Sequence, residues 1–193
     1  MKIRKVQAFG ATLCASVVAT ASADVIFDNI GAMDGSDMVI GNMHASQDFE
    51  DAYNVYDIAA VDDFSFSGGT LDSVSFILGG WNGYGGWGGI DGYIVNVYSS
   101  IAAAGNNLAG DVLSMTFGSA DYNGFWGGEN DYMSIDLGGV ALGAGDYFIS
   151  VVPINQYGIN GQTGIGMSTI GGDNGYQANP GGGFGFGSTN PTG

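Results

Sequence analysis

The sequence predicts an all-β protein, an antiparallel β-sandwich of the jelly-roll type with roughly eight to ten strands. Short runs rich in Val, Ile, Phe and Tyr alternate apolar and polar residues, as half-buried strands do. Glycine, at 37 of 193 residues, clusters between these runs, where turns are expected. Beyond the N-terminal segment, nothing of ten residues or more has the apolar period of a helix. A hydrophobic content of 45% is also too high for a disordered chain.

The clearest strand is the run 71–78, in which Val74, Phe76 and Leu78 share one face. The sequence 143–146, Gly-Ala-Gly-Asp, predicts a tight turn into a further strand, because glycine accepts a positive φ. The other expected strands are 55–66, 93–98, 112–117, 132–137, 146–152 and 164–170.

Residues 1–23 have the layout of a secretory signal peptide. The only basic residues of the sequence, Lys2, Arg4 and Lys5, precede an apolar stretch, and the small residues 21–23 follow it. The apolar stretch is shorter than the roughly 20 residues that cross a membrane. We therefore expect a secreted chain with a β-sandwich domain at 24–178. A Gly/Asn/Pro-rich tail would follow at 179–193. In one interpretation, the sequence is truncated here, before a last strand and an anchor.

The charge distribution excludes several functions. The chain has 19 acidic and three basic residues, a formal charge of −16, and no Lys or Arg after Lys5. Nucleic-acid binding is not expected, because Lys and Arg are needed to displace counterions from phosphates. Cleavage after Ala23 would also remove the only cysteine, Cys14, so neither a Lys Schiff base nor a Cys nucleophile would remain.

Four stretches of the sequence resemble a known group. They are 61–66, 71–76, 142–153 and 176–187. They are similar to secreted β-sandwich proteins of Gram-negative and planctomycete bacteria that carry a PEP-CTERM anchor for exosortase sorting. The resemblance implies a non-enzymatic extracellular-matrix or cell-surface protein, associated with exopolysaccharide or biofilm. Members end in a Val-Pro-Glu-Pro motif, an apolar helix and a basic tail. None of these is in the sequence, so a freely secreted relative and a chain that stops before its anchor are both open.

Two glycine-rich loops, 81–89 and 122–131, contain all three tryptophans and suggest a carbohydrate-binding, lectin-like module. Flat aromatic faces stack on the apolar face of a sugar ring, and amides and carboxylates bond its hydroxyls. In the alternative interpretation these rings cover one end of the sandwich, since an aromatic side chain buries about 150–250 Å². The candidate sugar-binding residues are Trp81, Asn82, Tyr84, Trp87, Phe125, Trp126 and Glu129.

Calcium is the one cofactor that the sequence suggests, because oxygen ligands are plentiful. No stretch has the EF-hand spacing, and 85–91 only approaches the calcium-binding nonapeptide of β-rolls. Solvated surface carboxylates are the alternative. The candidate calcium ligands are Asp62, Asp63, Asp131 and Asp173.

An enzyme is not expected. A pair of carboxylates could still form a glycan hydrolase, which is a third hypothesis. The single histidine, His44, lies near Ser46 and Asp48, but sequence neighbours rarely form a catalytic triad and no Gly-x-Ser-x-Gly elbow exists. The favoured interpretation is a matrix protein whose stable shell is its function, with extracellular polysaccharide or matrix components as partners.

Overall fold

The computed structural model describes residues 1–5, 24–171 and 175–189. Residues 6–23 of the expected signal peptide and the candidate ligand Asp173 lie outside the described residues. The described strands are β1 (Lys2–Lys5), β2 (Asp24–Asp28), β3 (Met38–Ala45), β4 (Ala59–Trp81), β5 (Gly92–Tyr98), β6 (Leu113–Phe117), β7 (Asp121–Trp126), β8 (Asn130–Ile154), β9 (Gln162–Ser168), β10 (Tyr176–Ala178) and β11 (Ser188–Thr189). The helices are all short: η1 (Asp51–Tyr56), η2 (Trp87–Gly89), α1 (Ile101–Asn106) and α2 (Tyr157–Asn160).

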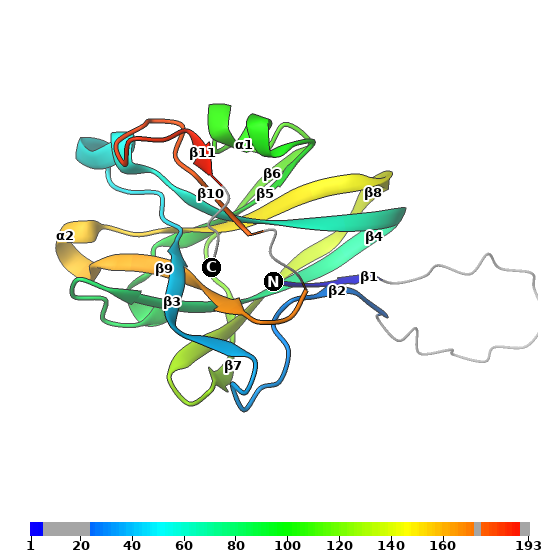
Figure 1. The fold of residues 1–193 in the computed structure, drawn as a ribbon, viewed down its shortest axis with the longest axis horizontal. Helices are drawn as coiled ribbons and strands as arrows, with labels where there is room; N and C mark the ends of the chain where they lie inside the picture. Colours follow the sequence, from blue (N-terminus) through cyan, green and yellow to red (C-terminus); the bar gives the residue numbers. More distant parts are fainter. Residues whose placement is uncertain (6–23, 172–174, 190–193) are drawn as a thin grey trace, which may run out of the picture.

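Two long strands, β4 and β8, organise the fold (Figure 1). They pair antiparallel along most of their length, and the register shifts between Leu71 and Ser73. On β8, Gly138 and Gly139 have positive φ close to this shift. Such irregularities bend a strand pair. The first half of β4 adjoins β10 and the second half adjoins β1 and β9, so the two halves lie in different layers.

The core lies between these layers. Val74, Phe76 and Leu78 of β4 are fully buried, as the alternation predicts. From the opposite layer, Tyr93 and Val95 of β5 belong to the same apolar cluster. The rings of Phe76 and Tyr93 lie 5.5 Å apart between their centroids. The prediction of an all-β antiparallel sandwich is confirmed.

The outer face of β4 carries a second, smaller core. Ile77 points away from the main core, and Ile30 and Trp126 cover it. A Cβ on Gly166 would lie 2.8 Å from the Ile77 side chain, so only glycine fits beside it. The Trp126 indole N–H donates a hydrogen bond of 2.9 Å to the Ala32 carbonyl. Trp126 therefore packs as a structural residue.

The expected strands differ from the structure in their limits. The tight turn predicted at 143–146 is wrong, because Gly145 and Asp146 lie inside β8, opposite Phe66 and Ser65. Glycine permits a turn but does not require one when both neighbouring strands supply hydrogen-bond partners. Two pairs of expected strands are each part of one continuous strand: 59–66 with 71–78 in β4, and 132–137 with 146–152 in β8. The start of the expected strand 55–66 is wrong, because Val55 and Tyr56 lie in the helix η1.

Residues 179–189, expected in a tail, pack against the sandwich. Asn179 is fully buried, and its side-chain amide donates to the carbonyls of Val55 and Asp57 at 3.1 and 2.8 Å. Phe186 packs on an apolar cluster, and β11 pairs with β10. This segment is part of the folded domain because its polar backbone finds partners there.

Asp57 should make stability depend on pH. Burial raises the pKa of its carboxyl to about 6, although the Phe49 amide donates to it at 2.9 Å. Between about pH 4 and 6 the folded state then holds a proton that the unfolded state releases, so this group's contribution to stability falls as pH rises. We expect Asp57→Asn to reduce the loss of stability between these pH values, measured by urea unfolding. Asp121→Asn, which removes one exposed carboxylate, is the matched control, and an equal effect in both variants would contradict the assignment.

Candidate functional site

Three exposed rings from the two glycine-rich loops form one cluster, which we call the aromatic platform: Trp87, Tyr122 and Phe125. Trp87 and Tyr122 stack with ring centroids 5.4 Å apart and an interplanar angle of 11°. Phe125 meets Tyr122 edge-on at 5.7 Å. The exposed fractions are 41% for Trp87, 38% for Tyr122 and 56% for Phe125, so these rings offer apolar surface to solvent.

A bulge in β7 brings Tyr122 and Phe125 together. Residues three apart on a regular strand point to opposite faces. Here the register shifts between Tyr122 and Phe125, and Gly124 between them has a φ of 111°. An L-residue rarely adopts this φ, so glycine allows both rings to reach the same cluster. The sequence Tyr-Asn-Gly-Phe thus determines the platform locally.

Asp131 ties the two loops together. The Tyr84 hydroxyl donates to its carboxylate at 3.5 Å, and the Trp87 backbone N–H also donates to it. Burial raises the pKa of Asp131, and these two hydrogen bonds partly offset that effect. The carboxylate is therefore occupied in positioning Trp87 beside β8.

Polar side chains near the platform are available for sugar hydroxyls. Asn123 is exposed, and its amide donates to the Ser134 hydroxyl at 2.8 Å and to the Asp121 carbonyl at 3.1 Å. Its side-chain oxygen can accept a further hydrogen bond. Glu129, in the β7–β8 turn, is exposed as well.

Three other candidate residues lie away from the platform or inside the fold. Trp81, 36% exposed, lies over Gly164, where a Cβ would come within 2.7 Å of the indole. Asn82 has a φ of 55° and forms a turn, and its amide donates to the Gln162 side chain at 3.2 Å. Tyr84 packs against the main core. Each of the three residues therefore makes contacts that support the fold.

Trp126 contradicts the expectation of an open ring. It is 1% exposed, so neither of its faces can meet a sugar. The physical reason is Ile77, an apolar residue on the outer face of β4 that needs a cover. For this tryptophan the alternative interpretation, a ring that shields the sandwich, is correct.

The candidate calcium ligands that the structure describes do not form one group. Asp62 lies opposite Ile149 and Asp131 opposite Leu78, at well-separated positions along the β4–β8 ladder. The Asn29 amide donates to Asp62 at 3.1 Å, and burial raises the pKa of this carboxyl. Within residues 1–5, 24–171 and 175–189, no three His, Cys, Asp or Glu side chains are arranged to hold a metal. Asp63 is the neighbour of Asp62 and adds no such group.

His44 is half-buried on β3, and burial lowers its pKa. Its Nε2 is buried without a hydrogen-bond partner in the described part of the chain. A catalytic histidine needs one nitrogen near a nucleophile and the other near an orienting group. The contacts of His44 within the described residues do not form a triad.

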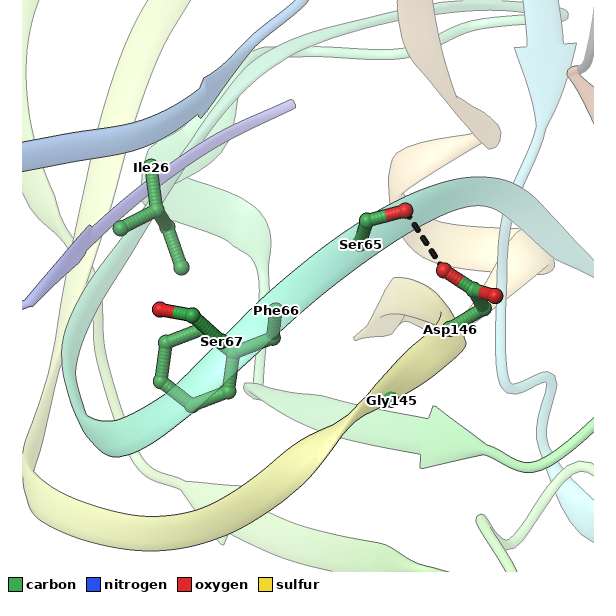
Figure 2. Close-up of a pocket in the computed structure, with 6 residues that line it drawn as sticks. All are labelled: Ile26, Ser65, Phe66, Ser67, Gly145 and Asp146. Carbon is green, nitrogen blue, oxygen red and sulfur yellow. Dashed lines mark hydrogen bonds between the residues drawn. The ribbon is translucent and has the colours of Figure 1, made fainter.

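A separate hollow of about 510 Å³ lies near the bend of β4 and β8 (Figure 2). Ile26 of β2 is one of its lining residues. The Ser65 hydroxyl of β4 donates a hydrogen bond of 2.6 Å to the Asp146 carboxylate of β8. Phe66, the one ring among its lining residues, is buried. The hollow therefore lacks the open aromatic faces that the platform provides. Its lining residues are Ile26, Ser65, Phe66, Ser67, Gly145 and Asp146.

Sequence reasoning missed the central role of Tyr122, which contacts both other rings of the platform. The sequence signal that could have identified Tyr122 is its position three residues before Phe125 in the same glycine-rich loop. Comparisons with protein-family models, with curated proteins and with solved structures find no match. Among the described residues, no helix has the length and apolar character needed to cross a membrane.

Proposed function

We propose that this protein is a secreted, non-enzymatic protein of the extracellular matrix or cell surface that binds polysaccharide through the aromatic platform. The observation that carries the proposal is the exposure of Trp87 and Phe125, two large rings whose backbones are fixed by strands and hydrogen bonds. Preformed rings lose little conformational entropy on binding. A clustered, exposed apolar patch rimmed by polar residues is typical of a binding surface.

The charge of the protein favours a neutral polysaccharide. The chain carries a formal charge of −16 and has no Lys or Arg after Lys5. An anionic polysaccharide would be repelled, most strongly at low salt, where the Debye length is long. Binding to a neutral polysaccharide should depend little on salt, because ring stacking is not a charge–charge interaction.

The experiment is affinity electrophoresis of the folded chain through gels that contain neutral or anionic polysaccharides, with calcium and with chelator. We expect a neutral polysaccharide to retard the protein and Trp87→Ala to weaken binding about 5- to 30-fold, as loss of an aromatic anchor does. Trp81→Ala, which removes an indole outside the platform, is the control. Equal weakening in both variants would contradict the proposal. Release of sugar from the polysaccharide would instead indicate the hydrolase hypothesis.

A structural role in the matrix is the second candidate. Eleven described strands in one sheet system and the absence of trypsin sites after Lys5 favour a stable, protease-resistant shell. If a folded protein is retarded in no gel, this role becomes the better account. Secretion is tested by N-terminal sequencing of exported protein, which should begin at Asp24.

A further inference from the structure

A second cleft, which we call the aromatic cage, shares no residue with the platform. Its volume is about 230 Å³. Five of its six lining residues are aromatic, and the sixth is Gln162, whose side-chain oxygen already accepts the Asn82 amide. The lining residues are Phe49, Tyr53, Tyr56, Tyr157, Gln162 and Phe184.

Two ring pairs of the cage meet at steep angles. Tyr53 and Tyr157 have centroids 6.2 Å apart and an interplanar angle of 70°. Tyr56 and Phe184 are 5.3 Å apart at 69°. Rings at such angles form the walls of a hollow, whereas a sugar needs a flat, open face. Each ring face carries negative charge density from the π system.

Hydrogen bonds within the protein hold the segments that carry these rings in place. The Glu50 carboxylate accepts the backbone N–H of Tyr157 at 2.8 Å. Buried Asn179 accepts the Phe184 N–H at 2.9 Å and donates to the Val55 carbonyl in η1. The three segments that carry the rings are thus connected by hydrogen bonds. A cage built in this way is preorganised for binding.

The charge around the cage suits a cation. Glu50 adjoins Phe49 in the sequence, is half-buried and is held ionised, because hydrogen bonds from backbone amides lower its pKa. Asp51 begins η1, the helix that carries Tyr53 and Tyr56. No Lys or Arg follows Lys5 in the whole sequence, so none of the segments around the cage supplies a cation of its own. The cage therefore combines ring faces, acidic neighbours and an overall negative field.

We propose that the aromatic cage binds the cationic head of an organic ammonium ion, such as a trimethylammonium group, through cation–π contacts with Tyr53, Tyr56 and Tyr157. The head can belong to a small molecule or to a methylated lysine of a partner protein, since both present the same chemistry. The inference is independent of polysaccharide binding, because it uses other residues and another force.

The test is a calorimetric titration of the full chain with choline chloride, against sodium chloride at equal ionic strength. Choline should bind saturably, and its uncharged tert-butyl analogue at least about 10-fold more weakly, because it has the shape without the charge. A trimethyllysine peptide is the second probe. Tighter binding of the peptide than of choline would indicate a partner protein, and the reverse would indicate a small molecule.

Variants identify the site. Tyr53→Leu and Tyr157→Leu keep apolar bulk but remove a ring, and each should weaken choline binding about 5-fold or more. Tyr122→Leu changes a platform ring and should leave choline binding unchanged, with circular dichroism showing that all variants fold. Equal binding of choline and its uncharged analogue would overturn the proposal, as would failure of both choline and the peptide to bind.

Discussion

A Trp126→Ala variant is expected to lose about 3–5 kcal/mol of unfolding free energy, as large-to-small changes of buried aromatic residues do. Trp126 and Ile30 cover Ile77 on the outer face of β4. Removal of the indole leaves a cavity there and exposes Ile77. It also removes the hydrogen bond to the Ala32 carbonyl. Urea unfolding followed by circular dichroism measures the change.

Trp87→Ala is the matched control, because it also removes an indole but from the exposed platform. Its effect should stay below about 1 kcal/mol, the usual range for surface positions. If Trp126→Ala unfolds at the same urea concentration as the unmodified chain, the small outer core does not stabilise the protein. Trp126 would then have to be reconsidered as an open ring.

The second large effect is expected on removal of residues 1–23. This deletion takes away β1, which pairs with both β2 and β4, and Ile3, which is fully buried in the main core. Burial of an isoleucine side chain contributes about 1.5–3 kcal/mol. With the lost hydrogen bonds, the chain 24–193 should be less stable than the full chain by about 3 kcal/mol or more.

Point variants separate β1 from the rest of the deleted segment. In the full chain, Ile3→Ala should cost about 2–5 kcal/mol, whereas Arg4→Ala, at an exposed side chain, should cost little. Equal stability of the full chain and the chain 24–193 would show that β1 adds nothing to the sheet. A loss in the shortened chain would show that β1 stabilises the sheet by covering the edge of β4 at 73–75.

The main layers of the fold could be predicted because alternation is a local signal. Val74, Phe76 and Leu78 fall on one face in any strand through 71–78, and burial of that face follows. The joining of 71–78 to the preceding strand could not be predicted in this way. Glycine-rich segments such as 67–70 are compatible with a turn and with a continuous strand, and only pairing with β8 decides between them.

The site was predictable only in part, because exposure is decided by distant neighbours. Trp87 and Trp126 both lie in glycine-rich loops, yet one is open and the other is buried. The difference comes from Ile77, about fifty residues before Trp126, and from Gly166, which leaves room beside it. No local pattern contains this information.

The aromatic cage had even less signal in the sequence. Its rings come from three segments, around residues 49–56, at Tyr157 and at Phe184, which long-range hydrogen bonds and ring contacts bring together. The segment after 178 was expected to be a tail because it is rich in Gly, Asn and Pro. Asn179 is instead buried, because its side-chain amide donates hydrogen bonds to the carbonyl of Val55 in η1 and to the carbonyl of Asp57, just after η1.

The most direct test of polysaccharide binding uses the three indole N–H signals in a nitrogen-15 correlation spectrum, assigned with single Trp→Phe variants. During titration with a neutral polysaccharide that retards the protein, the Trp87 signal should shift and the buried Trp126 signal should stay in place. Trp81 provides an internal reference outside the platform. A Trp87 signal that does not move, or a larger shift at Trp81, would contradict the claim that the platform binds the polysaccharide.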